Sequence, residues 1–269
     1  AEGNIDFRGD IVIHGNVESG VNIRATGSIT IDGVAEACML EAGKDIILRG
    51  GMLGGNKASV KTKGAITAKF FEFTNILCEG DLQADVLMDC SVICHGQIRL
   101  TGRKGSIIGG KVQAIRGLIA TSLGNDAEKR TEIFVGAGID VYSRLRVMEK
   151  KIETTREELA KIEEGLEKFE ILSKERGVSY TNDPRRTSLL RIKIKDSAML
   201  ASDEEEVRKL RILAESSKGA CVSVIQEIYP GVIINMGELK LALKNMATGV
   251  EFYKLPDKIG TRPCSAGVE

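Results

Sequence analysis

The strongest constraint on the fold is a short motif that recurs through the first half of the chain. A small residue or a lysine, the anchor, is followed by alternating apolar and polar residues. The motif occurs as Gly9-DIVI, Gly27-SITI, Lys44-DIIL, Gly64-AITA, Gly80-DLQA, Gly96-QIRL and Gly110-KVQA. The anchors recur about every fourteen to twenty residues, a spacing typical of the coils of a β-solenoid. Alternation of this kind turns one face of each strand inward.

The residues before each anchor have the same parity, as in Val21, Ile23 and Ala25 before Gly27. Each coil therefore has at least two short strands that meet at a corner, where glycine is suited to a tight turn. Stacked coils give parallel sheets around a thin aliphatic core. A left-handed hexapeptide solenoid would need a stricter six-residue period, so we expect a right-handed parallel β-helix over residues 1–144.

From Leu145 the apolar period changes from two to the 3-4 spacing of a coiled-coil seam. Asn182-Asp183-Pro184 is typical of a helix start, and a second helix is expected to run to about Ser217. We therefore predict an antiparallel coiled-coil hairpin over residues 145–218, inserted into a solenoid to which residues 219–269 return as a cap. The expected seam positions are Leu145, Met148, Ile152, Thr155, Leu159, Ile162, Leu166 and Phe169 in the first helix, and Leu189, Ile192, Met199, Val207, Leu210 and Leu213 in the second.

Composition argues against several classes of protein. The formal net charge is zero, so no global field attracts nucleic acid or anionic lipid. The 30 Gly, the absence of Trp and the 4% aromatic content are unusual for an enzyme with a pocket. Neither a membrane span nor a signal peptide is visible, which favours the cytoplasm. The six Cys lack the regular spacing of a secreted disulfide framework.

Two glycine-rich strings, GMLGGNK at 51–57 and GSIIGGK at 105–111, resemble a phosphate-binding loop. Such a loop needs Gly-x4-Gly-Lys followed by Ser or Thr and then a helix. Lys111 is followed by Val112 and by an alternating strand, and Asn56 stands where the first string would need its lysine. We therefore interpret both strings as corners of the solenoid, with Gly109 and Gly110 aligned with the anchor glycines.

Cysteines and aspartates supply the other candidate chemistry. Cys90 and Cys94 should face inward and His95 outward, which argues against a metal site, and Cys78 and Cys94 should stack in successive coils as small apolar core residues. Outward acids between strands usually keep a sheet soluble, although β-helices can also build polysaccharide-cleaving sites from them. The acids in question are Asp10, Asp45, Asp81, Asp85 and Asp89. Residues 185–195 form a basic helix face that lacks the interleaved aromatic residues expected of a nucleic-acid site.

The order of motifs is similar to that of the flagellar assembly protein A (FapA) family of bacterial proteins. The resemblance is carried by GNIDFRGDIVIHGNV at 3–17, GGMLGGN at 50–56, KGSIIGGKVQA at 104–114, the helical segment and IYPGVIINMG at 228–237. It implies a right-handed β-helix interrupted by a coiled coil, in a cytoplasmic protein with a scaffolding or regulatory role in flagellar assembly and motility. It implies no catalytic residues.

Sequence alone thus favours a non-enzymatic scaffold that needs no cofactor or metal and acts through protein partners, or as a homo-oligomer, rather than through nucleic acid or a membrane span. The alternative is a carbohydrate-acting or carbohydrate-binding β-helix protein. That alternative requires at least two acids and a base to converge on one face of a sheet.

Overall fold

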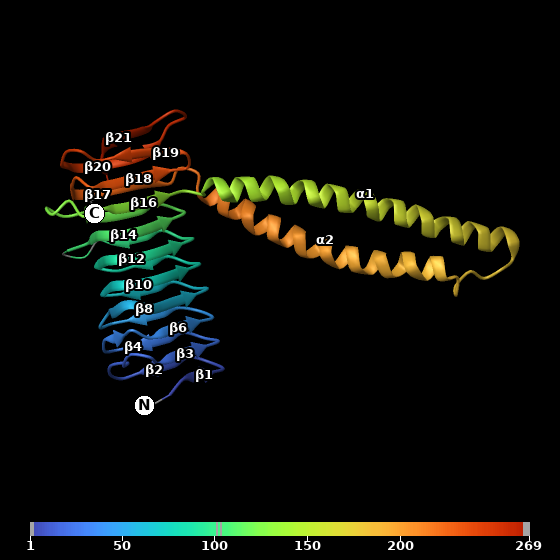
Figure 1. Ribbon diagram of the computed structural model, residues 1–269, viewed down its shortest axis with the longest axis horizontal. Helices are drawn as coiled ribbons and strands as arrows, with labels where there is room; N and C mark the ends of the chain where they lie inside the picture. Colours follow the sequence, from blue (N-terminus) through green and yellow to red (C-terminus); the bar gives the residue numbers. More distant parts are fainter. Residues whose placement is uncertain (1–2, 101, 103, 266–269) are drawn as a thin grey trace. The chain divides into compact units, whose positions relative to one another are not determined.

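The structure, a computed structural model, describes residues 3–100, 102 and 104–265. It divides into two compact units, one built from residues 1–138 and 216–269 and the other from residues 139–215. The first unit is a parallel β-solenoid and the second is a pair of long helices (Figure 1). The predicted mainly β, solenoid fold with two helices is therefore confirmed, while the right-handed winding and the coiled-coil geometry stay predictions.

Each coil of the solenoid has three faces. The first face is a parallel ladder whose successive strands pair in register, as Val60 pairs with Ile76 and Ile76 with Val92. Its strands are β1 (Ile5–Phe7), β3 (Asn22–Ala25), β6 (Met39–Ala42), β8 (Met52–Thr62), β10 (Phe70–Cys78), β12 (Val86–Cys94), β14 (Ser106–Ala114), β16 (Thr131–Val135) and β18 (Val232–Met236).

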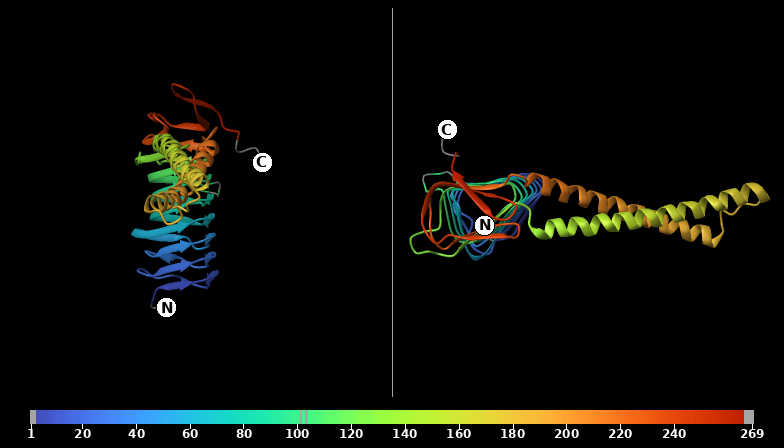
Figure 2. Two further views of the ribbon diagram at one scale, coloured as in Figure 1. Left: turned by 90° about the vertical axis from the view of Figure 1, so that its right-hand side faces the viewer. Right: turned by 90° about the horizontal axis from the view of Figure 1, so that it is seen from above.

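The second face is also parallel and follows the anchors. Its strands are β2 (Ile11–Ile13), β4 (Ile29–Ile31), β7 (Ile46–Leu48), β9 (Ile66–Ala68), β11 (Leu82–Gln83), β13 (Ile98–Leu100), β15 (Leu118–Leu123) and β17 (Cys221–Ile228). The third face is made by β5 (Ala35–Glu36), the first residues of β8, β10, β12 and β14, and the last residues of β15 and β17. Seen from above in Figure 2, successive coils of the solenoid overlie one another.

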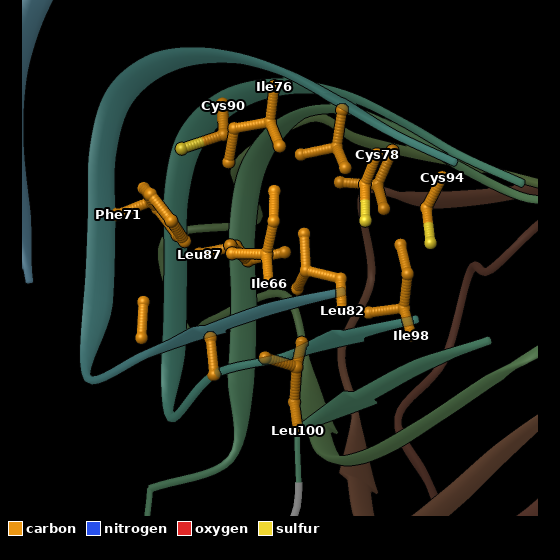
Figure 3. Packing of buried hydrophobic residues seen from close by; sticks show 14 of the residues in the cluster. Ile66, Phe71, Ile76, Cys78, Leu82, Leu87, Cys90, Cys94, Ile98 and Leu100 are labelled. Carbon is orange, nitrogen blue, oxygen red and sulfur yellow. The ribbon is translucent and has the colours of Figure 1, made fainter. Parts of the chain in front are cut away.

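Alternate residues of all three faces point into one aliphatic core (Figure 3). Phe71 on the third face, Leu82 on the second and Ile76 on the first are at most 3% exposed. Burying a side chain of this size contributes about 1.5–3 kcal/mol relative to leaving it in water. The core is therefore one continuous column that each coil extends, rather than a set of separate clusters.

One of the seven predicted anchors is wrong. Val112, in Gly110-KVQA, pairs with Val92 and Ile133 on the first face, whereas the residue that continues the second face after Ile98 is Leu118. The anchor position of this coil is held by Arg116, whose amide donates to the carbonyl of Gly96. Because strands on every face alternate with the same period, alternation alone could not assign Val112 to a face.

A paired aspartate and glycine join successive coils at several corners. Asp45 Oδ1 accepts a hydrogen bond of 2.7 Å from the amide of Ala65, and a Cβ atom on Gly64 would lie 2.3 Å from that oxygen. Asp10 bonds the amide of Ser28 and Asp81 that of Gln97, again beside a glycine of the next coil. The glycine is thus needed because the carboxylate of the preceding coil occupies the space that a side chain would fill.

After the helices the chain rejoins the solenoid. β17 pairs in parallel with β15, and β18 with β16. Three antiparallel strands then follow: β19 (Leu239–Ala242) on β18, β20 (Ala247–Lys254) on β17, and β21 (Ile259–Pro263) on β20. These strands cover edges that would otherwise present unpaired backbone groups to other chains.

The second unit consists of α1 (Ile139–Arg176) and α2 (Pro184–Ser216). α1 begins six residues before the expected Leu145. The prediction relied on the 3-4 spacing of apolar residues, and that spacing starts only at Leu145. α2 begins where predicted. Asp183 Oδ1 accepts a hydrogen bond of 2.8 Å from the amide of Arg185, which satisfies one of the free amides at the start of the helix.

Replacing Asp45 by alanine should lower the free energy of unfolding of the solenoid by about 1 kcal/mol, because the amide of Ala65 loses its partner. Asp45→Asn should change it by less than half as much, since Asn16 Oδ1 makes the equivalent bond to the amide of Val34 without a charge. Denaturant unfolding followed by circular dichroism measures both variants. Equal losses in the two variants would show that the charge, and not the acceptor, stabilises the corner.

Candidate interaction surfaces

The two glycine-rich strings occupy equivalent corners in different coils. Between the third and first faces, five successive coils each have a residue with a positive φ angle, and we call this column the positive-φ corner. Its members are Ala37, Asn56, Phe73, Asp89 and Gly109, with φ between 37° and 72°. The strings are therefore corners, as predicted, but the expected alignment of Gly109 and Gly110 with the anchor glycines is wrong.

The positive-φ corner uses its own polar groups internally. Side chains two residues downstream of a carbonyl donate to it: Thr74 to Glu72, Cys90 to Met88 and Thr131 to Lys129. The amide of Gly109, which a phosphate loop would direct at its ligand, donates instead to Thr131 Oγ1 at 2.8 Å. The lysine of the string is also engaged, because Lys111 Nζ lies 4.6 Å above the centre of the Phe134 ring.

A shallow hollow of about 380 Å³ lies on the outside of this corner. Its charged lining residues are Asp89, Lys111, Arg130 and Glu132. Asp89 pairs with Lys129, Arg130 pairs with Glu132, and Lys111 lies over the Phe134 ring, so the charged groups of the hollow already have partners within the chain. The geometry supports a structural corner better than a nucleotide site.

The buried cysteines belong to the core. Cys78 and Cys94 pair in register on the first face and lie side by side in Figure 3, as predicted. Their thiols donate to corner carbonyls of the preceding coils, Cys78 to Gly64 and Cys94 to Gly80. Thr62, in the same column, donates to Lys44 in the same way. Sequence reasoning treated these thiols as apolar, and the threonine one coil earlier was the signal for their donor role.

Burial makes most of the core thiols poor nucleophiles. It raises the pKa of Cys38 and of Cys90 to about 11. The hydrogen bond between Cys78 and Cys94 lowers the pKa of Cys78 and, together with burial, raises the pKa of Cys94. Thiolate is the reactive form of cysteine, so its population at neutral pH is small at Cys38, Cys90 and Cys94. In the part of the chain that the structure describes, no three His, Cys, Asp or Glu residues could hold a metal ion.

The five candidate aspartates lie at separate corners. Asp10, Asp45 and Asp81 each bond an amide of the next coil, and Asp89 pairs with Lys129. Asp85 lies beside Gly102, where an added Cβ would be 2.2 Å from its Oδ1 atom. These acids have structural partners in place of the convergence that a polysaccharide-cleaving site requires.

The helices of the second unit pack antiparallel. Ion pairs link the first half of α1 to the second half of α2, namely Arg144 with Glu206, Glu149 with Arg211, Lys151 with Asp203 and Arg156 with Glu204. Further along α1, Glu163 pairs with Lys193 in the first half of α2. The predicted seam of α1 is buried or half-buried throughout. In α2, however, Ile192 and Met199 are exposed, and the positions that are less exposed follow another 3-4 series: Leu189, Lys193, Asp196, Leu200, Asp203, Val207, Leu210 and Ala214.

The prediction for α2 was right at Leu189, Val207 and Leu210 and missed the charged members of this series, Lys193, Asp196 and Asp203. Asp203 has a side chain only 12% exposed, and its Oδ2 atom lies 2.6 Å from Lys151 Nζ. Thr155, which is buried, satisfies its hydroxyl within α1 by donating to the carbonyl of Lys151. A polar layer in an otherwise apolar seam commonly fixes the register and the number of helices.

Two of the five basic residues in segment 185–195 are engaged within the hairpin. Arg185 pairs with Asp183 and lies over the Phe169 ring, while Lys193 pairs with Glu163. The bond to Arg185 lowers the pKa of Asp183. These contacts support the interpretation of the segment as a helix face rather than a nucleic-acid site.

Replacing Gly110 by valine should prevent the solenoid from folding normally. Its φ of 78° disfavours a β-branched residue, and an added Cβ would lie 2.2 Å from the carbonyl oxygen of Cys90. The loss should exceed about 3 kcal/mol. Thermal unfolding and soluble yield measure it, and Asn56→Gly, at φ 62°, is the matched control that should be tolerated. A folded Gly110→Val protein that had lost nucleotide binding would restore the phosphate-site interpretation.

Replacing Asp203 by leucine should make the helices more stable but less specific in their pairing. The change removes a half-desolvated charge and adds apolar surface to the seam. We expect a rise in the helical unfolding temperature of a few degrees together with new oligomers in analytical ultracentrifugation. Asp203→Asn, which keeps the polarity, should not form them. An unchanged oligomeric state in Asp203→Leu would show that the polar layer does not control pairing.

No helix among the described residues has the length and apolar character required to cross a bilayer. No curated protein and no solved structure matches the chain. The model of the flagellar assembly protein A (FapA) β-solenoid domain matches residues 1–259. The match includes the coils, the helices and the returning strands as far as β20, and the chain therefore belongs to the flagellar assembly protein A family.

Proposed function

We propose that this protein is a non-catalytic scaffold of bacterial flagellar assembly that acts in the cytoplasm through protein contacts of its solenoid and its helices. Family membership supports a role related to flagellar assembly. The contacts of the acids and thiols support a non-catalytic role, because the groups that would do chemistry already hold corners together.

The observation that carries the proposal is the exposed apolar surface of α2. Ile192 is 42% exposed, Met199 is 38% exposed and Ile194 is 71% exposed, although the helix has a complete seam elsewhere. Ile192 and Met199 are seven residues apart, so they lie on one side of the helix beside that seam. Apolar residues at such spacing commonly engage another helix. The occupant is a protein partner or another copy of the chain.

The test is the double substitution Ile192→Glu/Met199→Glu in the chromosomal copy of a motile bacterium that carries this gene. Both positions are exposed, so the helices should still form, and circular dichroism checks this. We expect the swimming zone in soft agar to shrink to less than about half and cross-linked protein partners to be lost. The expectation rests on the loss of two apolar contacts, each contributing about 1–2 kcal/mol in an interface.

Ser202→Glu provides the matched control, since it adds a carboxylate at an exposed polar position of the same helix. It should leave both swimming and cross-linking unchanged. Normal motility and an unchanged set of cross-linked proteins in the double variant would rule out this side of α2 as the contact surface.

A further inference from the structure

The third face of the solenoid carries an apolar patch on its outer side. Two rows run across successive coils in register on the outer side, Phe70, Val86 and the buried Ser106 in one, and Leu53, Glu72, Met88 and Ile108 in the other. We call its apolar members the third-face patch: Leu53, Phe70, Val86, Met88 and Ile108. Leu53 is 41% exposed and the others are half-buried. They extend over β8, β10, β12 and β14, whose places on the solenoid are labelled in Figure 1.

A hollow of about 450 Å³ lies within the patch. Phe70 forms one side of it because its ring covers Gly51, where an added Cβ would lie 2.5 Å from a ring carbon. The aliphatic walls come from Val86 and Met88. The full lining is Lys69, Phe70, Phe71, Glu72, Asp85, Val86, Met88 and Lys104.

Charges of both signs border the hollow. Glu72 lies in the coil before Val86, and Lys104 precedes Ser106 in the coil after it. Along the strand direction, Glu72 is level with Met88, two residues after Val86. Lys104 comes two residues before Ser106, which is level with Val86, and so lies on the opposite side of Val86. Among the described residues, the side chains of Glu72 and Lys104 have no ion-pair partner. An acid and a base are thus placed diagonally across Val86, each without a local partner.

We propose that the third-face patch binds a second copy of this chain about a two-fold axis through Val86. Such an axis exchanges the coil before Val86 with the coil after it, and exchanges the two sides of the face. Val86 of one copy therefore packs on Val86 of the other. Glu72 of each copy lies opposite Lys104 of the other, so this charge pair forms twice. A two-fold interface must be self-complementary, and this diagonal arrangement of charges satisfies that requirement.

The same axis places Phe70 of one copy over the position of Ser106 in the other, where the serine is small and 7% exposed, and Ile108 beside the aliphatic stem of Lys69. Apolar contacts at the centre with opposite charges at the rim are the usual composition of a specific interface. This surface is independent of the exposed residues of α2 on which the proposed function rests. The two proposals can therefore fail separately.

The test uses charge reversal in the full-length protein, measured by sedimentation velocity from about 1 to 100 µM. We expect the wild type to dimerise, and we expect Glu72→Lys and Lys104→Glu each to weaken the dimer by tenfold or more, because like charges then meet twice. Mixing the two single variants should restore association as a heterodimer, in which each introduced charge meets an opposite one. The double variant Glu72→Lys/Lys104→Glu should restore the homodimer.

Glu36→Lys is the matched control, because Glu36 is exposed on the same face at the end of β5, outside the coils that the axis brings together. It should leave the dimer unchanged, as should Ile192→Glu/Met199→Glu in α2. A wild type that stays monomeric at 100 µM, single variants that dimerise normally, or failure of the mixed variants to associate would each overturn the proposal. Occupation of the patch by a different protein, detected as a cross-link from Val86→Cys to that protein in cells, would also overturn it.

Discussion

Everything in the solenoid depends on parallel pairing between residues of the same role in consecutive coils. Because Cys78 lies on Cys94 and Leu82 on Ile98, any inward side chain has a similar neighbour above and below it. The core therefore needs neither aromatic residues nor a single large cluster, which explains how 4% aromatic content suffices. It also explains the corner chemistry, since a turn that is stacked on another turn must satisfy its amides and carbonyls within the stack.

The corners satisfy that demand with a small set of donors and acceptors. Carboxylate or amide oxygens of Asp10, Asn16, Asp45 and Asp81 accept amides of the following coil, and hydroxyl or thiol groups of Thr62, Cys78 and Cys94 donate to carbonyls of the preceding one. Each bond contributes only about 1 kcal/mol, but an unsatisfied buried group would cost more. Aspartates and cysteines that suggest catalysis or metal binding in the sequence therefore stabilise the corners, and the neighbouring glycines leave room for them.

The sequence predicted the solenoid because the period of two is kept over most of its short strands and breaks mainly at corners, and it predicted the start of α2 because Asp183 and Pro184 act through local geometry. It could not identify the face of a strand, since all faces share that period, and so Val112 was placed on the wrong ladder. The anchor Arg116 and the charged seam residues Lys193, Asp196 and Asp203 escaped notice for a related reason. The role of each of these residues is set by neighbours that are distant in sequence. Such positions accept any side chain that can reach solvent or an opposite charge.

The place of the helices in the chain has a consequence for how the protein folds. Ile133 and Ile234 pair in adjacent strands although about a hundred residues separate them, and closing so long a loop from a disordered chain slows folding. Antiparallel helices bring their two outer ends together, so their prior formation shortens that loop to about twenty residues, among them β17. The ladder from β16 to β18 then closes at a much smaller entropic cost.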